Sequence, residues 1–262
     1  MTILMSLLTS FLSIVCLMSL VWMISVKKKD ASLVDRVWGL NFILIVTVYL
    51  FLSPERTPQM VLIWILASIW GLRLSWHIHT RNRLHGEDYR YKTMRENHGE
   101  KFWWYSFFSV FLLQGFLSWI ISAPLHWIFL SPIHSFALLD FLALAMWSLG
   151  FYFEAVGDWE LKQFKLNPQN KGRICNIGLW SLCRHPNYFG DAVIWWSFYI
   201  FALNTPYGYL SFFGPLLMTL FLRYVSGVTL LEKNMRQKNT EYIEYIANTP
   251  AFIPNIFKLK RK

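Results

Sequence analysis

Long apolar segments alternate with short charged connections along the whole chain. A helix needs about 20 mostly apolar residues to cross the hydrocarbon core of a bilayer. Seven stretches meet this requirement, at 3–25, 31–52, 59–79, 102–121, 136–159, 188–203 and 207–230. The second is weakened by Asp35 and Arg36, and the sixth is short. The pattern predicts an all-α, polytopic membrane protein with seven transmembrane helices.

The distribution of positive charge predicts the orientation of these helices. Lys and Arg follow the first, third and fifth segments, whereas the connections after the second, fourth and sixth contain only Arg56. Positive loops face the cytoplasm. We therefore expect an N-terminus outside, a cytoplasmic C-terminus and a basic cytoplasmic cap. The hydropathy predicts an integral membrane protein, which we expect in a bacterial inner membrane, with the endoplasmic reticulum as the alternative. No linker divides the chain, which predicts one domain over 1–262, with a cofactor-binding half at about 136–262.

Composition narrows the class of partner. Apolar residues make up 55% of the chain, and the net charge is +10. A basic membrane protein is suited to anionic headgroups or an anionic cofactor, so we expect membrane lipids as partners and no nucleic acid. Cys16, Cys175 and Cys183 lack zinc-site spacing and predict free thiols without a metal. The sequence leaves the oligomeric state open, and a monomer is compatible with it.

The octapeptide Arg-His-Pro-Asn-Tyr-Phe-Gly-Asp at 184–191 is the most specific polar motif. A proline suits the first turn of a helix, which places the basic pair Arg184 and His185 just before a helix that starts near Pro186. Asn187 and Asp191 are four residues apart and share one face of that helix. The motif predicts an anion-binding site, and its alternative is an anchor among lipid headgroups.

A second polar face ends the fifth segment. Glu154, Asp158, Lys162 and Lys165 share one helical face by their three- and four-residue spacing. Carboxylates at membrane depth tend to be functional. The two lysines, and Arg173 in the next loop, can bind phosphate. An ordinary Asp158–Lys162 ion pair is the alternative. No glycine-rich phosphate loop is present, so side chains would have to hold a nucleotide.

Polar residues elsewhere could act on a substrate. Asp35 opens the second segment, with Arg36 and Arg73 as candidate ion-pair partners, and Gln114 lies in the middle of the fourth. Either could polarise a substrate carbonyl, although Gln114 could instead bind a neighbouring helix.

Three further residues lie close to membrane-segment ends. Tyr89 and Tyr91, in the connection before the fourth segment, could donate a proton or could be interfacial tyrosines. Glu232, at the end of the last segment, could reach a cofactor or pair with Arg236, and we expect the tail to dock on the protein.

Several of these motifs together resemble a known family. They are DRVWG at 35–39, GEDYRY at 86–91, Gln114-Gly115, GLWSLCRHPNYFGD at 178–191, LEK at 231–233 and Phe-Ile-Pro at 252–254. The chain resembles the bacterial membrane proteins grouped with steroid 5α-reductases, in the DUF1295 branch. The resemblance implies a seven-helix fold that uses NADPH to reduce a carbon–carbon double bond conjugated to a ketone in a steroid or other lipid from the bilayer.

Site residues carry over from that resemblance position by position. Glu154 and Asp158 match an Asn-x-x-x-Asp element, with Glu in place of Asn, and Asn187 and Asp191 match an Asn-x-x-Gly-Glu element. Lys162, Lys165 and Arg173 match basic residues that hold the cofactor's adenosine phosphates. Arg184 and His185 match the sterol C14-reductase and methyltransferase relatives better than the animal steroid reductases. Together with Tyr188 and Glu232, they complete the expected cofactor-binding residues. The family's Gln-Glu pair, which polarises the ketone, has no aligned counterpart, so Asp35, Gln114, Tyr89 and Tyr91 are candidate catalytic substitutes.

Two other functions stay open. Isoprenylcysteine and phospholipid methyltransferases, which use S-adenosylmethionine, also carry an Arg-His-Pro-x-Tyr-x-Gly element, but their following Glu-Glu pair is Glu232-Lys233 here. The other alternative is a lipid-binding membrane protein without catalysis.

Overall fold

The computed structural model describes residues 2–83, 86–131, 133, 135–225, 227–229, 231–232 and 241–255. Throughout these described ranges the regular structure is helical, and no strand occurs. The chain divides into two compact units, Met1–Phe136 with Thr205–Ser211, and Ala137–Asn204 with Phe212–Lys262. The division falls close to residue 136, where we expect the cofactor-binding half to begin.

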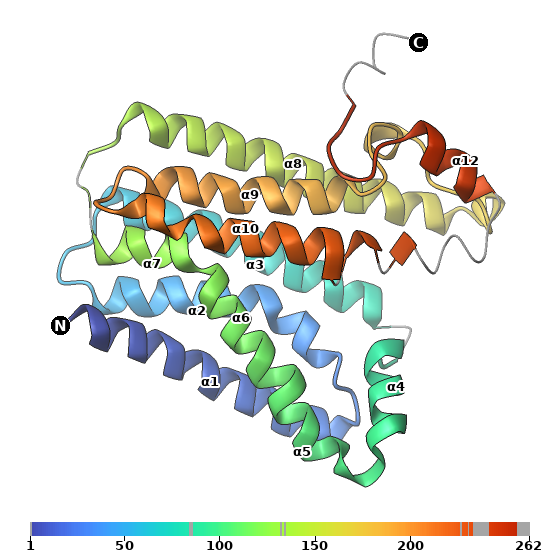
Figure 1. The fold of residues 1–262 in the computed structure, drawn as a ribbon, viewed down its shortest axis with the longest axis horizontal. Helices are drawn as coiled ribbons and strands as arrows, with labels where there is room; N and C mark the ends of the chain where they lie inside the picture. The colour runs from blue at the N-terminus through green and yellow to red at the C-terminus, as the bar shows by residue number, and fades with distance from the viewer. Residues whose placement is uncertain are drawn as a thin grey trace. The chain divides into compact units, whose positions relative to one another are not determined.

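The first unit contains three long helices and a fourth that is broken into several pieces (Figure 1). Its elements are α1 (Ile3–Lys28), α2 (Leu33–Leu52), α3 (Pro58–Asn82), α4 (Tyr89–His98), η1 (Gly99–Lys101), α5 (Phe102–Ser106), η2 (Phe107–Leu112), α6 (Leu113–Ile121) and α7 (Ala123–Leu130). Polar caps explain where two of them begin. Thr57 and Asp88 accept hydrogen bonds from the backbone N–H groups of Met60 and Arg90 at 3.3 and 3.0 Å, which satisfies donors that a helix start leaves unpaired.

Helices α2 and α3 pack backbone against backbone. A Cβ atom added to Gly39 would lie 2.4 Å from the carbonyl oxygen of Gly71, so only glycine allows this approach. Beside it the buried rings of Phe42 and Trp70 meet edge to face, with centroids 5.3 Å apart.

A buried polar network joins α1, α2, α6 and α7 within the first unit. The Tyr49 hydroxyl lies 3.0 Å from Ser10 Oγ and 2.8 Å from His126 Nδ1. His126 Nε2 lies 2.8 Å from the carbonyl oxygen of Trp119, and Trp119 Nε1 donates to Ser10 Oγ at 3.2 Å. The side chains of Ser10, Tyr49, Trp119 and His126 therefore satisfy one another's hydrogen bonds, as burial in an apolar environment requires.

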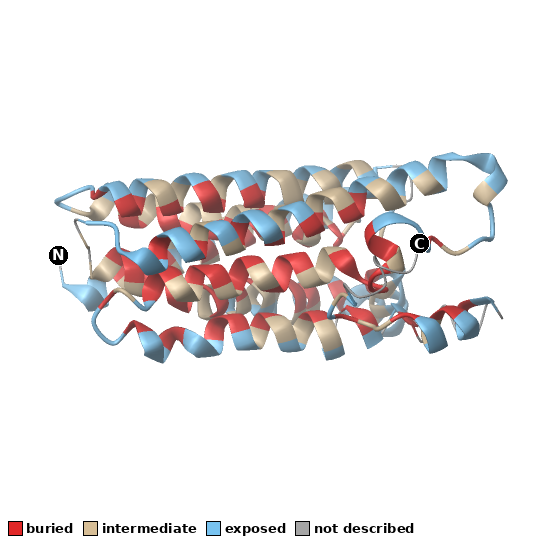
Figure 2. Ribbon diagram, turned by 90° about the horizontal axis from the view of Figure 1, so that it is seen from above, coloured by how far each residue is buried: buried red, intermediate tan, exposed pale blue. Residues whose placement is uncertain are grey.

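The second unit is organised around a pair of long neighbouring helices, α8 and α9. Its elements are α8 (Leu138–Leu166), η3 (Pro168–Asn170), η4 (Gly178–Ser181), α9 (Pro186–Ala202), α10 (Phe213–Leu220), η6 (Phe221–Val225) and α12 (Glu241–Asn248). The 3₁₀ segment η5 (Gly208–Phe212) ends at the boundary between the units. Helix α9 begins at Pro186, as predicted, and more than half of its residues are buried. Figure 2 marks buried residues in red and exposed residues in pale blue along the ribbon.

Six helical segments among the described residues are long and apolar enough to cross a membrane. They are Ile3–Lys28, Leu33–Leu52, Pro58–Asn82, Tyr89–Ile121, Leu138–Leu166 and Gly208–Val225. Large apolar side chains such as Leu12, Phe141 and Leu138 are 61%, 62% and 75% exposed. Such surfaces fit lipid better than water, so the chain has the character of an integral, multi-pass membrane protein.

The remaining predicted segment, at 188–203, corresponds to α9. This helix has 17 residues, at the lower limit for crossing a bilayer. Three shorter helices of the described ranges, α4, α7 and α12, were not predicted as helices. Helix α7 forms directly after Ser122, with a proline in its first turn. The three cysteines are free thiols, as expected.

Candidate functional site

Four polar side chains from α8 and α9 form the first candidate site. Glu154 and Asp158 of α8 and Asp191 of α9 are buried, with 3%, 7% and 6% exposure, and Asn187 of α9 is half-buried. Asn187 Nδ2 donates to Asp158 Oδ1 at 2.9 Å. The buried Oδ1 atom of Asn187 has no hydrogen-bond partner in the part of the chain that the structure describes. We call these four residues the α8–α9 cluster.

Glycine at position 190 brings the two helices of this cluster together. A Cβ atom there would lie 2.4 Å from the backbone nitrogen of Glu154 and 2.4 Å from the carbonyl oxygen of Gly150. Both contacts are with backbone, which cannot move aside as a flexible side chain can. The glycine of the octapeptide thus sets the distance at which Asn187 reaches Asp158.

Basic side chains lie in exposed positions beyond the buried carboxylates. Lys162 and Lys165 extend from the last turns of α8, and Arg173 lies in the loop between η3 and η4. The second unit therefore combines polar groups that water hardly reaches with exposed cations that can bind phosphate.

The octapeptide's basic pair binds the tail of the chain. Arg184 Nε and Nη2 donate to the two carboxylate oxygens of Glu232 at 2.8 and 3.1 Å, and His185 Nε2 lies 3.2 Å from Glu232 Oε1. Burial opposes ionisation of Glu232, but the hydrogen bonds and charges of His185 and Arg184 outweigh it and lower the Glu232 pKa to about 2. We call these three residues the Arg184 cluster.

Backbone groups complete the docking of the tail. Arg184 Nη1 donates to the carbonyl oxygens of Ile246 and Thr249, and the backbone N–H of Arg184 donates to Pro250 at 2.9 Å. The ring of Tyr188 stacks on His185, with centroids 5.7 Å apart. The predicted partner of Glu232, Arg236, lies outside the described residues.

Two aromatic residues, for which we predicted no role, also hold this region together. Trp180 Nε1 donates to the carbonyl oxygen of Gly157 at 2.9 Å, and the Tyr245 hydroxyl donates to the carbonyl oxygen of Trp180. Both residues are buried. Trp180 belongs to the GLW motif, which was a signal in the sequence, whereas Tyr245 could be recognised only from the tertiary structure.

In the first unit, three of the four predicted catalytic residues come together. The Tyr91 hydroxyl donates to Asp35 Oδ1 at 2.7 Å, and Gln114 Nε2 donates to the Tyr91 hydroxyl oxygen at 3.0 Å. Arg90 Nη2 lies 2.8 Å from Asp35 Oδ2. We call Asp35, Arg90, Tyr91 and Gln114 the Asp35 cluster.

The expected ion-pair partners of Asp35 were wrong. Arg36 pairs instead with Asp30 at 2.8 Å, because adjacent residues of a helix project about 100° apart. Asp35 pairs with Arg90, which was not among the predicted site residues although it lies in the GEDYRY motif. Arg73 also does not bind Asp35.

Tyr89 does not join its neighbours in this cluster. It is the first residue of α4 and is 54% exposed, whereas Tyr91 is 5% exposed. Residues two apart project to different faces of a helix. The structure therefore distinguishes two tyrosines that the sequence left equivalent.

A π-helical segment precedes the glutamine of the Asp35 cluster. The segment η2 spans Phe107–Leu112, and Gln114 follows two residues later. A π-helical turn holds more residues than an α-helical turn and shifts the faces of the helix beyond it, and such segments often occur at functional sites.

Comparisons with known proteins give two relatives in the fission yeast Schizosaccharomyces pombe. An uncharacterized protein is 24% identical over 265 residues, which is 91% of this chain and 76% of the relative. The Delta(14)-sterol reductase of the same organism is 35% identical over 65 residues, 23% of this chain and only 15% of that protein. No solved structure matches the chain.

A family relationship extends over nearly the whole chain. The family described as "Protein of unknown function (DUF1295)" matches residues 21–249, a range that contains the α8–α9, Arg184 and Asp35 clusters. This family is related to steroid 5α-reductase-like proteins. The chain therefore belongs to the DUF1295 family of membrane proteins.

Proposed function

We propose that this protein uses NADPH to reduce a carbon–carbon double bond conjugated to a ketone in a steroid or other membrane lipid. The observation that carries the proposal is the α8–α9 cluster. Its buried Asn187 Oδ1 lacks a partner among the described residues, and two of its carboxylates, Glu154 and Asp158, lie on the helix that continues to exposed Lys162 and Lys165. The partial match to a sterol reductase supports the same class of reaction.

In this proposal the second unit binds the cofactor. Lys162, Lys165 and Arg173 would bind its phosphates, because they are exposed and positively charged. Glu154, Asp158, Asn187 and Asp191 would bind its ribose and amide groups, and the unpaired Asn187 oxygen fits an amide N–H. When bound, the cofactor supplies a hydride.

The Arg184 cluster would have a supporting role in this site. Arg184, His185 and Glu232 bind one another and the tail. They would therefore fix the start of α9, together with Tyr188, so that Asn187 and Asp191 keep their positions.

The Asp35 cluster would polarise the ketone of the substrate. Its Tyr91 hydroxyl donates its proton to the Asp35 carboxylate and accepts a hydrogen bond from the Gln114 amide. A proton held there can stabilise negative charge on a carbonyl oxygen. Arg90, which pairs with both Asp35 and Asp88, would keep the Asp35 carboxylate oriented toward Tyr91.

The proposal includes a membrane topology. Helix α9 would be the sixth of seven membrane crossings along the chain. The protein would lie in a bacterial inner membrane, with the N-terminus outside and the basic connections and C-terminus on the cytoplasmic side. The lipid substrate would enter laterally from the bilayer.

Ligand binding to the detergent-purified full chain tests this function. A ligand present at 100 times its dissociation constant stabilises the folded state by about 2.7 kcal/mol. We expect thermal stabilisation by NADPH and none by S-adenosylmethionine, followed by oxidation of NADPH when enone lipids are added. Stabilisation by S-adenosylmethionine alone would overturn the proposal.

A methyltransferase is the second candidate. The residues that this chain shares with the methyltransferase motifs, Arg184, His185 and Glu232, form one buried cluster. In that case Glu232→Gln should abolish stabilisation by S-adenosylmethionine.

A further inference from the structure

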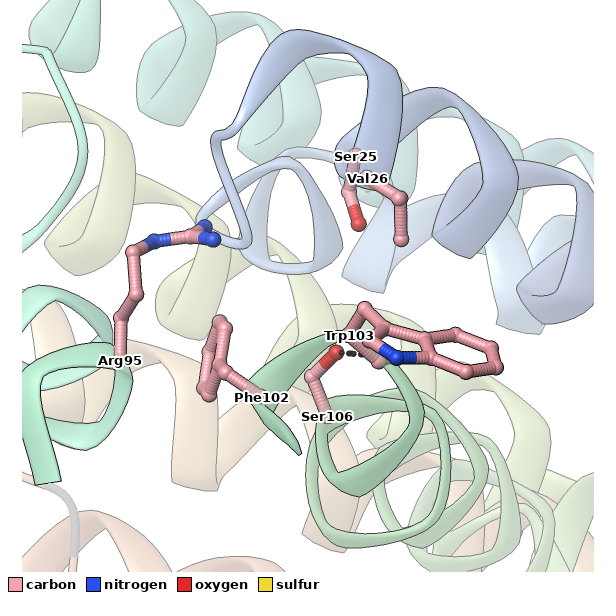
Figure 3. A pocket seen from close by; sticks show the side chains of 6 residues that line it. All are labelled: Ser25, Val26, Arg95, Phe102, Trp103 and Ser106. Atoms are coloured by element: carbon pink, nitrogen blue, oxygen red, sulfur yellow. Dashed lines mark hydrogen bonds between the residues drawn. The ribbon is translucent and has the colours of Figure 1, made fainter. Parts of the chain in front are cut away.

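A small pocket lies in the first unit, apart from the Asp35 cluster. It has a volume of about 30 Å³, and its lining residues come from the last turn of α1 and from α4 and α5. Figure 3 shows Ser25 and Val26 of α1 facing Phe102, Trp103 and Ser106, with the guanidinium of Arg95 at the side. The pocket is too small for a sterol, so it suits a small polar group.

Arg95 supplies the charge of this pocket. Its Nε and Nη2 atoms donate to Glu87 at 3.1 and 2.8 Å, and its guanidinium carbon lies 4.5 Å from the centre of the Phe102 ring. No hydrogen bond from Nη1 is present in the described part of the chain. Two N–H donors of an oriented guanidinium therefore remain available to an anion.

Further cations neighbour the pocket-lining residues in the sequence. Lys27 and Lys28 end α1 directly after Val26, Lys29 is the C-cap of α1, and Lys101 lies directly before Phe102. All four lysines are exposed. Glu87 balances one charge and the exposed Glu96 and Glu100 two more, so positive charge remains in excess around the pocket.

Aromatic and apolar side chains place the pocket at the surface of a bilayer. The Trp22 and Trp103 rings stack, with centroids 6.2 Å apart, and Trp22 Nε1 donates to the Trp103 carbonyl oxygen at 2.8 Å. Trp103 is 54% exposed, and Met23 and Ile24 of α1 are 51% and 49% exposed. Tryptophan favours the headgroup level of a membrane, and exposed apolar side chains below it can contact acyl chains.

We propose that this pocket binds the headgroup of an anionic phospholipid. The phosphate would accept hydrogen bonds from Arg95 Nη1 and attract the lysines at the end of α1, while headgroup hydroxyls enter the space between Ser25 and Ser106. A lipid fits better than free phosphate, because apolar side chains flank the cations. The site would act independently of the proposed reductase activity.

Native mass spectrometry of the detergent-solubilised full chain tests the proposal. We expect phosphatidylglycerol to be retained more strongly than phosphatidylcholine, and an excess of inorganic phosphate not to displace it. Arg95→Lys keeps a positive charge to pair with Glu87 but removes the guanidinium fork. It should weaken phosphatidylglycerol retention about fivefold, the effect of about 1 kcal/mol for one lost hydrogen bond.

Lys92→Gln is the matched control, since Lys92 is exposed on the same helix but does not line the pocket. It should retain the lipid as the natural chain does. If Arg95→Lys does not fold, the triple change Lys27→Gln, Lys28→Gln and Lys29→Gln leaves the Arg95–Glu87 pair intact and should also weaken retention. Equal retention of both lipids, or displacement by inorganic phosphate, would overturn the proposal.

Discussion

At the scale of single residues, Tyr91 connects the polar groups of the Asp35 cluster. Gln114 donates to its oxygen, so the hydroxyl proton is directed to Asp35. A tyrosine in this position can share its proton with a substrate oxygen without moving far. The half-buried Asp35 would remain hydrogen-bonded to Arg90 throughout.

Tyr91→Phe should therefore remove catalysis and leave cofactor binding unchanged. Loss of a positioned proton donor costs about 10²–10⁴-fold in rate, and loss of its hydrogen bonds costs about 1 kcal/mol in stability. The measurements are enone-dependent NADPH oxidation and thermal stabilisation by NADPH.

Tyr89→Phe provides the control, because Tyr89 is exposed on the same helix. It should keep the full rate. Equal activity of both variants would show that the Tyr91 hydroxyl takes no part in the reaction.

Glu232→Gln should destabilise the protein by about 3–5 kcal/mol, because it leaves Arg184 buried without its counter-charge. The effect should depend on pH. The folded-state pKa of Glu232 is lowered to about 2, so its contribution is fully present above its unfolded pKa of about 4.3. The contribution is lost as the pH falls toward 2.

Thermal unfolding in detergent between pH 7 and pH 2 measures this effect. The difference in stability between the natural chain and Glu232→Gln should be constant from pH 7 down to about pH 4.3 and should shrink at lower pH. Glu244→Gln, at an exposed position of α12, should change little. If the difference in stability did not change with pH, ionised Glu232 would not be the group that stabilises Arg184.

The sequence identified the members of these clusters better than their partners. Asp35, Tyr91 and Gln114 could be selected one by one, because polar groups are costly in apolar segments. Their contacts join residues 56 and 23 positions apart, and those of Arg184 and Glu232 join residues 48 apart. Only tertiary packing decides such pairs, so Arg90 was overlooked.

At the scale of helices, the approach of α8 to α9 depends on glycine. Gly190→Ala should destabilise the second unit by about 3 kcal/mol, the upper end for overpacking, because the added methyl group meets backbone at 2.4 Å. NADPH binding should weaken as well, since Asn187 would move away from Asp158.

Gly115→Ala is a suitable comparison for this change. Its methyl group would meet only the side chains of Ile14 and Met18, at 3.0 and 3.1 Å. These side chains can adjust, so we expect a smaller loss of thermal stability and unchanged NADPH binding. A larger loss for Gly115→Ala than for Gly190→Ala would contradict the prediction.

Hydropathy and helix-start signals predicted most helices, but not the irregular ones. Pro186 marked the start of α9 correctly. Helix α7 was missed because it is shorter than a membrane crossing. The π-helical segment η2 lies within an apolar run, where hydrophobicity alone cannot reveal a change in helical register.

At the scale of the whole molecule, the open question is whether α9 crosses the membrane. Six crossings would place the two termini on the same side, whereas seven would place them on opposite sides. The charge distribution favours seven.

Reporter fusions in a bacterial inner membrane decide this topology. We expect fluorescence from a green fluorescent protein fused after Lys171 and alkaline phosphatase activity from a fusion after Thr205, because α9 lies between these positions. If green fluorescent protein is fluorescent when fused after Lys171 and also when fused after Thr205, both positions are cytoplasmic and α9 does not cross the membrane.

The buried network of Ser10, Tyr49 and His126 has two possible directions. With a neutral His126, Nε2–H donates to the Trp119 carbonyl oxygen and Nδ1 accepts from Tyr49, while Ser10 can donate either to Tyr49 or to the Leu7 carbonyl oxygen. A proton added at Nδ1 would reverse this order, so that Tyr49 donates to Ser10 and Ser10 donates to the Leu7 carbonyl oxygen, 2.9 Å away. One protonation event could thus reorient hydroxyl groups on two helices without moving a heavy atom.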